Sequence, residues 1–166
     1  MHRNAELVQD ALRSAGSPAV VVELAGSTRT AAEAAAALGV EVGQIAKSLV
    51  FVADGEPVVA VLSGSDRLDT EKLRRHLGAV GVERADADAV RSATGFPIGG
   101  VSPVGHAVRT VLDDGLARYD AVWAAAGTPH AVFKTSLDEL VAICGAELAD
   151  VRESRRGGAG VVSPRP

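Results

Sequence analysis

The sequence predicts one α+β domain in which helices flank a mixed β-sheet. Helix-like and strand-like segments alternate irregularly along the 166 residues, and two β-rich runs around Asp54-Gly55 form the clearest hairpin. A purely parallel, doubly wound sheet would instead require a regular alternation of strands and helices. The hydrophobic content of 47% is enough for one buried core, and the chain is too short for two full-sized domains.

The first half of the chain is predicted to contain two helices, one strand and the hairpin. Apolar residues recur on one face of residues 5–14 and the pattern stops at Gly16, which predicts a first helix. Thr30 and Glu33 have the spacing of a capping box at the start of a second helix. The predicted elements, in order, are a helix over 5–14, a strand over 19–24, a helix from Thr30 to about Leu38, a turn through 43–45 that leads to Lys47, and the hairpin over 48–64.

The second half is predicted to combine three helices with three short strands. Polar residues of the types that cap helix N-termini precede each of the three apolar helical patterns. The predicted elements are a helix from Asp69 or Thr70 to Gly78, a helix from Asp86 or Asp88 to about Thr94, strands over 109–112, 121–126 and 131–134, and a helix from Ser136 to Ile143. Beyond them, basic residues, glycines and prolines follow one another without periodicity, so residues 1–150 are predicted as the domain and 151–166 as a disordered tail.

Charge and cysteine content narrow the classes of function. A net charge of −4 argues against an extended groove for a nucleic-acid backbone, although gripping a single nucleotide end needs only one or two local cations. The apolar stretches are too short to span a membrane and the N-terminus does not resemble a signal peptide, which predicts a cytoplasmic location. The single cysteine, Cys144, rules out an internal disulfide and lies in an apolar helical pattern typical of core packing.

The segment "TGFPIGGVSPVGH" at 94–106 contains more glycine and proline than a helix interior or a central strand can accommodate. Glycines at 99 and 100 would let a ligand approach bare main-chain amides, because no side chain keeps it away. The same composition is also typical of a structural turn. Both readings stay open at this point.

The familiar catalytic motifs are absent from the sequence. Ser102 resembles a nucleophile elbow, but the position two residues later is Val104 where that motif has glycine. No Gly-Lys-Ser/Thr closes a phosphate-binding loop, and a dinucleotide fingerprint fails on spacing. The histidines, which are His2, His76, His106 and His130, show no metal-ligand spacing, so neither a metal nor a cofactor is expected.

Three features at element boundaries are left as candidates for binding groups. They are Lys47, the glycine-proline loop, and "AAGTPH" at 125–130. Lys47 has apolar neighbours and no acidic residue close by in sequence, which is also typical of a surface lysine whose stem packs along apolar groups. His130 equally suits a hydrogen-bonded residue at a strand end. Spacing alone does not assign a function.

The segments "QIAKSLVF" at 44–51, "GGVSPVG" at 99–105 and "AAGTPHAVF" at 125–133 resemble the signature stretches of the YbaK/EbsC family. Members of this family are free-standing relatives of the editing domain of bacterial prolyl-tRNA synthetases. The resemblance covers roughly residues 5–150 and implies an α+β fold with a curved mixed sheet. It also implies an aminoacyl-tRNA deacylase, which hydrolyses the ester between a wrong amino acid and the terminal adenosine of a tRNA, most often the tRNA for proline.

The resemblance also implies a site. Lys47 would lie near the terminal nucleotide, and the loop from Gly99 to Pro103 would hold the ester carbonyl with its backbone amides, while water or a ribose hydroxyl assists without a protein nucleophile. The implied catalytic residues are Lys47, Gly99 and Gly100, and the implied substrate-binding residues are Thr30, Ser48, Val101, Ser102, Pro103, Gly127, Thr128 and His130. The implied partner is the acceptor end of an aminoacyl-tRNA, presented alone or by a synthetase or an elongation factor. Cysteine, alanine, serine and threonine all stay open as the amino acid removed.

Two other classes of function stay open. In the first, the same loop recognises a nucleotide or a peptide end without turnover, which the presence of both Lys47 and the Gly99 to Pro103 motif disfavours. In the second, Ser102 is the nucleophile of a small-molecule esterase, which the missing elbow glycine disfavours.

Overall fold

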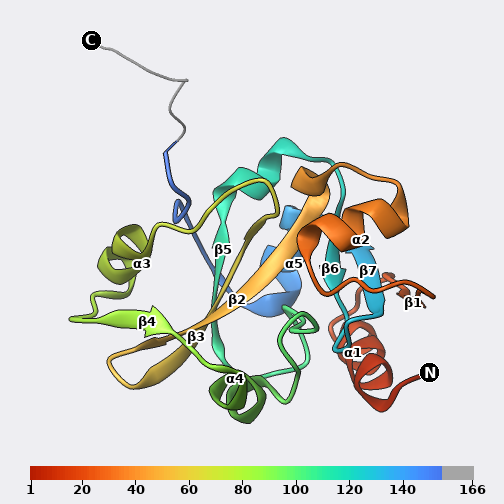
Figure 1. Ribbon diagram of the computed structural model, residues 1–166, viewed down its shortest axis with the longest axis horizontal. Helices are drawn as coiled ribbons and strands as arrows, with labels where there is room; N and C mark the ends of the chain where they lie inside the picture. The colour runs from red at the N-terminus through yellow and green to blue at the C-terminus, as the bar shows by residue number, and fades with distance from the viewer. Residues whose placement is uncertain (155–166) are drawn as a thin grey trace.

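The computed structural model describes residues 1–154, which form an eight-stranded mixed sheet with helices packed around it (Figure 1). The helices are α1 (Arg3–Ser14), α2 (Ala31–Leu38), α3 (Thr70–Leu77), α4 (Ala87–Thr94) and α5 (Leu137–Cys144), with the 3-10 helices η1 (Val42–Gln44) and η2 (Asp114–Arg118). The strands are β1 (Val21–Glu23), β2 (Ile45–Ala53), β3 (Glu56–Ser63), β4 (Val82–Arg84), β5 (Arg109–Asp113), β6 (Val122–Ala125), β7 (Ala131–Thr135) and β8 (Glu147–Ala149). The predicted α+β class with a mixed sheet is confirmed.

Local capping signals place the helices where the sequence predicts them. The Thr30 hydroxyl accepts a hydrogen bond from the Glu33 amide, and the Glu33 carboxylate accepts one from the Thr30 amide, which completes the capping box of α2. Asp69, Asp86 and Ser136 cap α3, α4 and α5 with their side chains. Each of these helices ends at a glycine in the left-handed conformation, which other residues adopt only at a cost.

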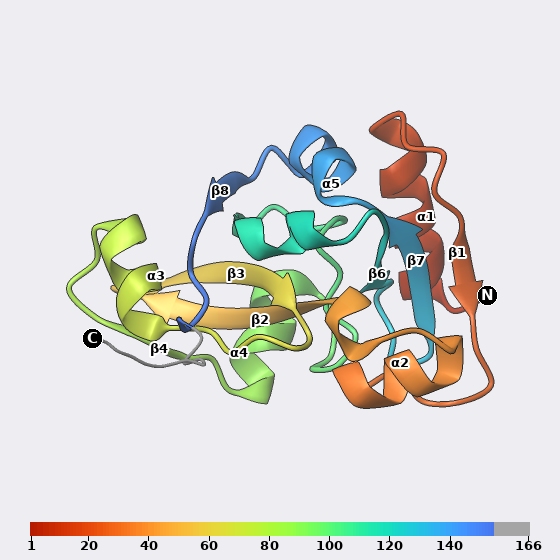
Figure 2. The ribbon, with the colours of Figure 1, turned by 90° about the horizontal axis from the view of Figure 1, so that it is seen from above.

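The sheet is built around the β2–β3 hairpin. Its order is β1-β7-β6-β2-β3-β5-β8, with β4 as an additional partner of β2. The β2–β6, β3–β5 and β5–β8 pairs are parallel and the others are antiparallel. Figures 1 and 2 show α3 at one end of the sheet and α1 with β1 at the other.

The core consists of one large cluster and two smaller ones. The large cluster packs α1, α4 and α5 and the loop after α4 against the sheet, with Phe96 and Phe133 almost completely buried. A second cluster packs Leu73 of α3 on Phe51 of β2, and a third packs α2 on Ile45. Cys144 lies against the large cluster, as its apolar pattern predicts. In the described part of the chain, no helix is long and apolar enough to cross a membrane.

The structure differs from the sequence-based expectation at two short strands and at the end of the domain. β4 and β8 have three residues each and lack a strong alternating pattern, so only their partners in the sheet define them. The tail was predicted to begin at residue 151, but Val151 is fully buried and Arg152 forms ion pairs with Asp113 and Asp114. The packed chain therefore extends past that boundary, and residues 155–166 of the predicted tail lie outside the described residues.

Candidate functional site

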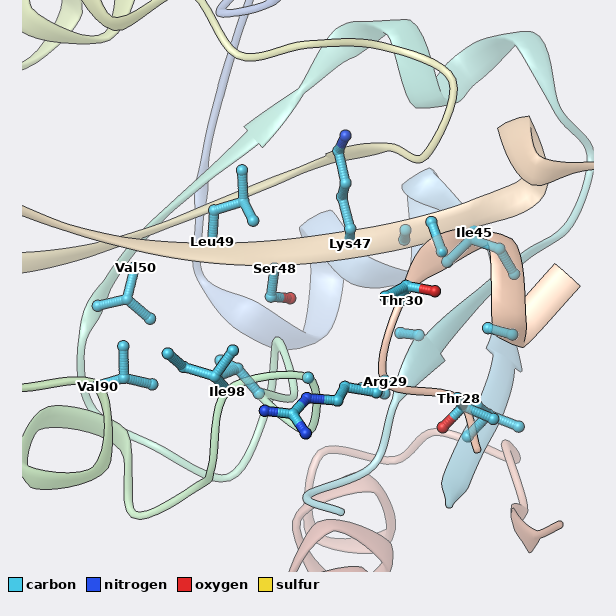
Figure 3. Close-up of a pocket in the computed structure, with 18 of the residues that line it drawn as sticks. Thr28, Arg29, Thr30, Ile45, Lys47, Ser48, Leu49, Val50, Val90 and Ile98 are labelled. Atoms are coloured by element: carbon cyan, nitrogen blue, oxygen red, sulfur yellow. The ribbon is translucent and has the colours of Figure 1, made fainter. Parts of the chain in front are cut away.

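A cavity of about 370 Å³ opens beside the middle of β2. Figure 3 shows side chains of its lining, which come mainly from β2, from the segment before α2 and from α4 with the loop after it, and further lining residues come from α2, β4, β6 and β7. The lining residues are Thr28, Arg29, Thr30, Ala31, Ala34, Ile45, Ala46, Lys47, Ser48, Leu49, Val50, Arg84, Ala85, Val90, Ile98, Gly99, Val101, Trp123, Ala124, Ala125 and Val132. Segments far apart in sequence therefore meet here.

The cavity exists because one edge of β2 is only partly paired. On that edge β6 pairs with residues 45–46 and β4 pairs with residues 51–53. Among the described residues, no strand pairs with 47–49 on this side. Lys47 and Ser48 leave opposite faces of β2, as neighbours in a strand do (Figure 3). The cavity therefore offers both faces of β2 and an open backbone edge to a ligand.

Lys47 is half-buried at the third residue of β2, and its ammonium is held by a backbone carbonyl. Its Nζ atom donates a hydrogen bond to the Asp66 carbonyl oxygen at 2.6 Å. Burial lowers the pKa of Lys47, and the negative charge of Asp66 opposes that effect. Lys47, which the sequence marked as a candidate binding group, is thus a partly desolvated cation in a cavity. Such a group can bind an anion or a developing negative charge.

Gly99 and Gly100 lie in the predicted loop but have different surroundings. Gly99 lines the cavity with a φ of +84°, and a β-carbon there would lie 2.6 Å from the Cγ atom of Arg29. Gly100 is buried outside the lining, and its amide donates a hydrogen bond to the Pro97 carbonyl at 2.9 Å. Of the loop amides expected to hold the ester carbonyl, the Gly100 amide therefore already has an acceptor, in a turn within the loop.

The remainder of the loop is packed inside the protein. Val101 lines the cavity, whereas Ser102 and Pro103 are buried and do not. The Ser102 side chain is fully buried, and its Oγ atom accepts a hydrogen bond from the Val104 amide at 3.1 Å. Ser102 therefore supports the shape of the loop, and its hydroxyl is not presented to the cavity.

The "GTPH" segment lies behind the loop and outside the cavity lining. Asn4 donates a hydrogen bond from its side chain to the Gly127 carbonyl at 3.0 Å. The Thr128 hydroxyl accepts one from the His130 amide at 3.1 Å. His130 is exposed, with its Nδ1 atom 3.1 Å from the Gly26 carbonyl oxygen. These contacts join the segment to α1 through Gly127 and to the chain before α2 through His130, while Thr128 bonds within the segment.

Some hydroxyl groups of the cavity lining already have a hydrogen-bond partner in the protein, and others do not. The Thr30 hydroxyl is occupied by the capping box of α2. The hydroxyls of Thr28 and Ser48 are buried without a hydrogen-bond partner, and both residues line the cavity. Buried hydroxyls in native proteins are normally hydrogen-bonded, so these two are suited to receive polar atoms of a ligand. Thr28 was missed because no local pattern marks it.

The charged residues of the lining are Arg29, Lys47 and Arg84, and no carboxylate is among them. Arg29 and Arg84 are exposed, and neither forms an ion pair in the described part of the chain. A protein with a net charge of −4 therefore has a locally cationic cavity. Both arginines were missed from sequence, because tertiary structure alone brings residues 29 and 84 to the same cavity.

One group of carboxylates could be considered for a metal ion. Asp113, Asp114 and Asp150 lie close together. Arg152 extends into this group, with its Nη1 atom 3.1 Å from Asp113 and 2.5 Å from Asp114. The Arg152 guanidinium and the Lys72 ammonium, which lies 3.3 Å from Asp150, offset most of the negative charge, so the cluster is explained as an ion-pair network.

Comparison with known proteins relates this chain to aminoacyl-tRNA editing domains. A family model described as an aminoacyl-tRNA editing domain matches residues 25–143. Proline–tRNA ligase from Nitratidesulfovibrio vulgaris (strain Hildenborough) is 43% identical over 95 residues, which are 57% of this chain and 17% of the ligase. Proline–tRNA ligase from Streptococcus sanguinis (strain SK36) is 37% identical over 116 residues, which are 66% of this chain and 19% of the ligase. The chain thus spans less than one fifth of these relatives.

Two solved structures have the same fold over most of their length. A proposed trans-editing enzyme for prolyl-tRNA synthetase is 47% identical with a TM-score of 0.86, over 93% of this chain and 99% of that one. A hypothetical protein is 33% identical with a TM-score of 0.83, over 89% of this chain and 99% of that one. These structures have the size of the described domain.

Proposed function

The chain belongs to the family of aminoacyl-tRNA editing domains, and on this premise we propose that it hydrolyses the ester of a mischarged aminoacyl-tRNA. The substrate proposed is tRNA for proline that carries a wrong amino acid, because a similar solved structure and the ligase relatives are connected with prolyl-tRNA synthesis. The observation that carries the proposal is the cavity itself, in which a glycine loop and three cations line a space without a carboxylate. Such a lining suits the anionic 3′ end of a tRNA.

The proposed chemistry uses water as the nucleophile. Water attacks the ester carbonyl, the bond to the ribose oxygen breaks, and that oxygen takes up a proton as the amino acid leaves. The Gly99 and Val101 amides have no protein acceptor among the described residues and belong to the part of the loop that lines the cavity, so they are the candidate donors to the developing oxyanion. A preorganised donor of this kind contributes about 3 kcal/mol at an acyl-transfer site.

Lys47 is proposed to hold the terminal nucleotide from the opposite face of β2, while Ser48 and Thr28 receive polar atoms of the substrate. Gly100, Ser102, Pro103, Gly127, Thr128 and His130 are proposed to act by supporting the loop. Ser102 as an esterase nucleophile is disfavoured by its complete burial and by its hydrogen bond to Val104. The proposal also includes a synthetase or an elongation factor that presents the tRNA to the site.

The test is a deacylation assay with the full chain. Proline tRNA charged with alanine, cysteine, serine, threonine or proline is the substrate panel, and the free amino-acid esters are assayed beside it. We expect at least one mischarged tRNA to be hydrolysed well above its spontaneous rate, with prolyl-tRNA spared. Binding without turnover would support a recognition module instead. Equal rates on tRNA and free esters would support a small-molecule esterase.

A further inference from the structure

The ammonium of Lys47 is held by a loop that is itself fastened by an ion pair. The loop connects β3 to α3, and its Asp66 carbonyl accepts the hydrogen bond from Lys47. The Asp66 carboxylate forms an ion pair with Arg118 at the end of η2. The Arg118 Nε atom also donates a hydrogen bond to the Gly115 carbonyl at 2.7 Å, which fixes the guanidinium to η2. A chain of contacts thus runs from η2 to the cavity.

Asp66 is much more buried than a typical surface carboxylate. Its side chain is 5% exposed, while that of Arg118 is 37% exposed. Breaking an ion pair that has a buried member costs more than breaking a surface pair, because water does not replace the partner that the buried charge loses. The Arg118 guanidinium also lies over the Tyr119 ring, 5.5 Å from its centre, which further restricts its position.

Asp66 opposes the groups that lower the pKa of Lys47. Arg67 from the same loop and Arg84 from β4 both act to lower the pKa of Lys47, and burial acts in the same direction. Among residues 1–154, the negative charge of Asp66 is the influence that raises it. The Asp66 carbonyl also favours the ammonium, because a hydrogen bond from a charged donor is stronger than one from a neutral amine, and the Asp66 carboxylate adds a full negative charge to that effect.

We infer that Asp66 and Arg118 are positioning residues for Lys47: Arg118 fixes the loop so that the Asp66 carbonyl orients the ammonium, and the Asp66 carboxylate keeps the ammonium charged. This inference rests on the proposed function, in which Lys47 binds the terminal nucleotide. It adds two residues that lie outside the cavity lining and act on the substrate only through Lys47.

The first test measures the charge on Lys47 without any tRNA. The chain has three lysines, which are Lys47, Lys72 and Lys134, so selective ¹³C labelling at lysine Cε gives a simple spectrum, and Lys47→Ala identifies the Lys47 signal. In Asp66→Asn, which keeps the backbone carbonyl and the side-chain shape, we expect the pKa of Lys47 to fall below that of the wild type. In Arg118→Gln, which keeps the carboxylate, it should not fall.

The second test measures deacylation of the substrate that the wild type prefers. Both variants should lose kcat at least ~10-fold, because a displacement of about 1 Å in a reacting complex can cost on the order of 10²-fold. Asp66→Asn should also lose activity at a lower pH than the wild type, since its Lys47 deprotonates earlier. Arg118→Lys, which retains the positive charge, should recover part of the activity lost in Arg118→Gln.

Glu147→Gln is the matched control, because it also removes a carboxylate that pairs with an arginine, Arg109, and lies outside the cavity lining. It should change neither the Lys47 titration nor kcat. An Asp66→Asn protein with an unchanged Lys47 pKa, wild-type kcat in both variants, or an equal loss in Glu147→Gln would each overturn the inference. If the wild type deacylates no substrate, the proposed function fails, while the titration still decides whether Asp66 maintains the charge.

Discussion

Gly100 packs directly against the main chain of Thr128. A β-carbon placed on Gly100 would lie 2.9 Å from the N, Cα and C atoms of Thr128, closer than real β-carbons come to backbone. The glycine loop and the "GTPH" segment, which are both part of the resemblance to editing domains, are therefore joined backbone to backbone. Glycine is needed at 100 for this close approach between two loops.

This contact predicts severe impairment in Gly100→Ala. The added methyl group must push the two loops apart, and a shift of about 1 Å at Gly99 and Val101 is enough to cost on the order of 10²-fold in turnover. The measurement is kcat/KM on one mischarged tRNA, together with a denaturation midpoint. Gly81→Ala is the control, because a β-carbon there has no neighbour within 4 Å.

Ser102→Ala should retain most of its activity. The Ser102 hydroxyl is buried and accepts a hydrogen bond from the Val104 amide, so its loss weakens the loop by about 1 kcal/mol without removing a reacting group. The assay is the same as for Gly100→Ala. An inactive Ser102→Ala beside an active Gly100→Ala would support the serine-nucleophile alternative and refute our account of the loop.

Lys47→Ala should reduce deacylation at least ~10-fold while leaving the protein folded, because it removes the cation proposed to bind the terminal nucleotide and leaves a site that water can fill. Lys134→Ala is the control, since Lys134 is exposed on β7 and outside the cavity lining. Circular dichroism and steady-state kinetics are the measurements. Undiminished turnover in a folded Lys47→Ala protein would remove Lys47 from the proposed site.

Salt should weaken tRNA binding only modestly. A protein that neutralises about one to three phosphates gives a log–log slope of affinity against salt concentration on the order of −1 to −3. The cationic part of the cavity consists of Arg29, Lys47 and Arg84, which is consistent with so small a number. Filter binding or fluorescence anisotropy over a salt series measures the slope, and a value typical of extended duplex binders would contradict the prediction.

Arg29→Gln and Arg84→Gln test which residues produce that slope. Each should raise the Kd for tRNA and make the slope shallower by about one unit, because one phosphate contact is lost. Arg13→Gln is the control, since Arg13 is exposed on α1 and pairs with Asp10. Unchanged slopes in both variants would place the phosphate contacts elsewhere.

The Cys144 thiol should react slowly in the native protein. Burial raises its pKa to about 11, so very little of the nucleophilic thiolate is present near pH 8. Reaction with a disulfide reagent at that pH should be slow in buffer and fast in denaturant. Rapid reaction in buffer would show that Cys144 is accessible and contradict the predicted packing role.

The sequence by itself determined the helices, the hairpin and the fold class. Capping residues such as Thr30, Asp69 and Ser136 act on amides within three residues of themselves, so their effect is visible in local spacing. The same holds for the turn at Asp54-Gly55 between two β-rich runs. Gly99 and Lys47 were also found from sequence, and both line the cavity.

Only the tertiary structure decided how the site is assembled. The open edge of β2 exists because β6 and β4, about 40 residues apart along the chain, pair with its two ends and leave the middle unpaired. The contact of Gly100 with Thr128 and the tether from Arg118 through Asp66 to Lys47 likewise join distant segments. Such contacts depend on how the whole chain packs, and no local spacing encodes them. The sequence therefore marked Gly100 as important, but its close packing against Thr128 could be found only in the structure.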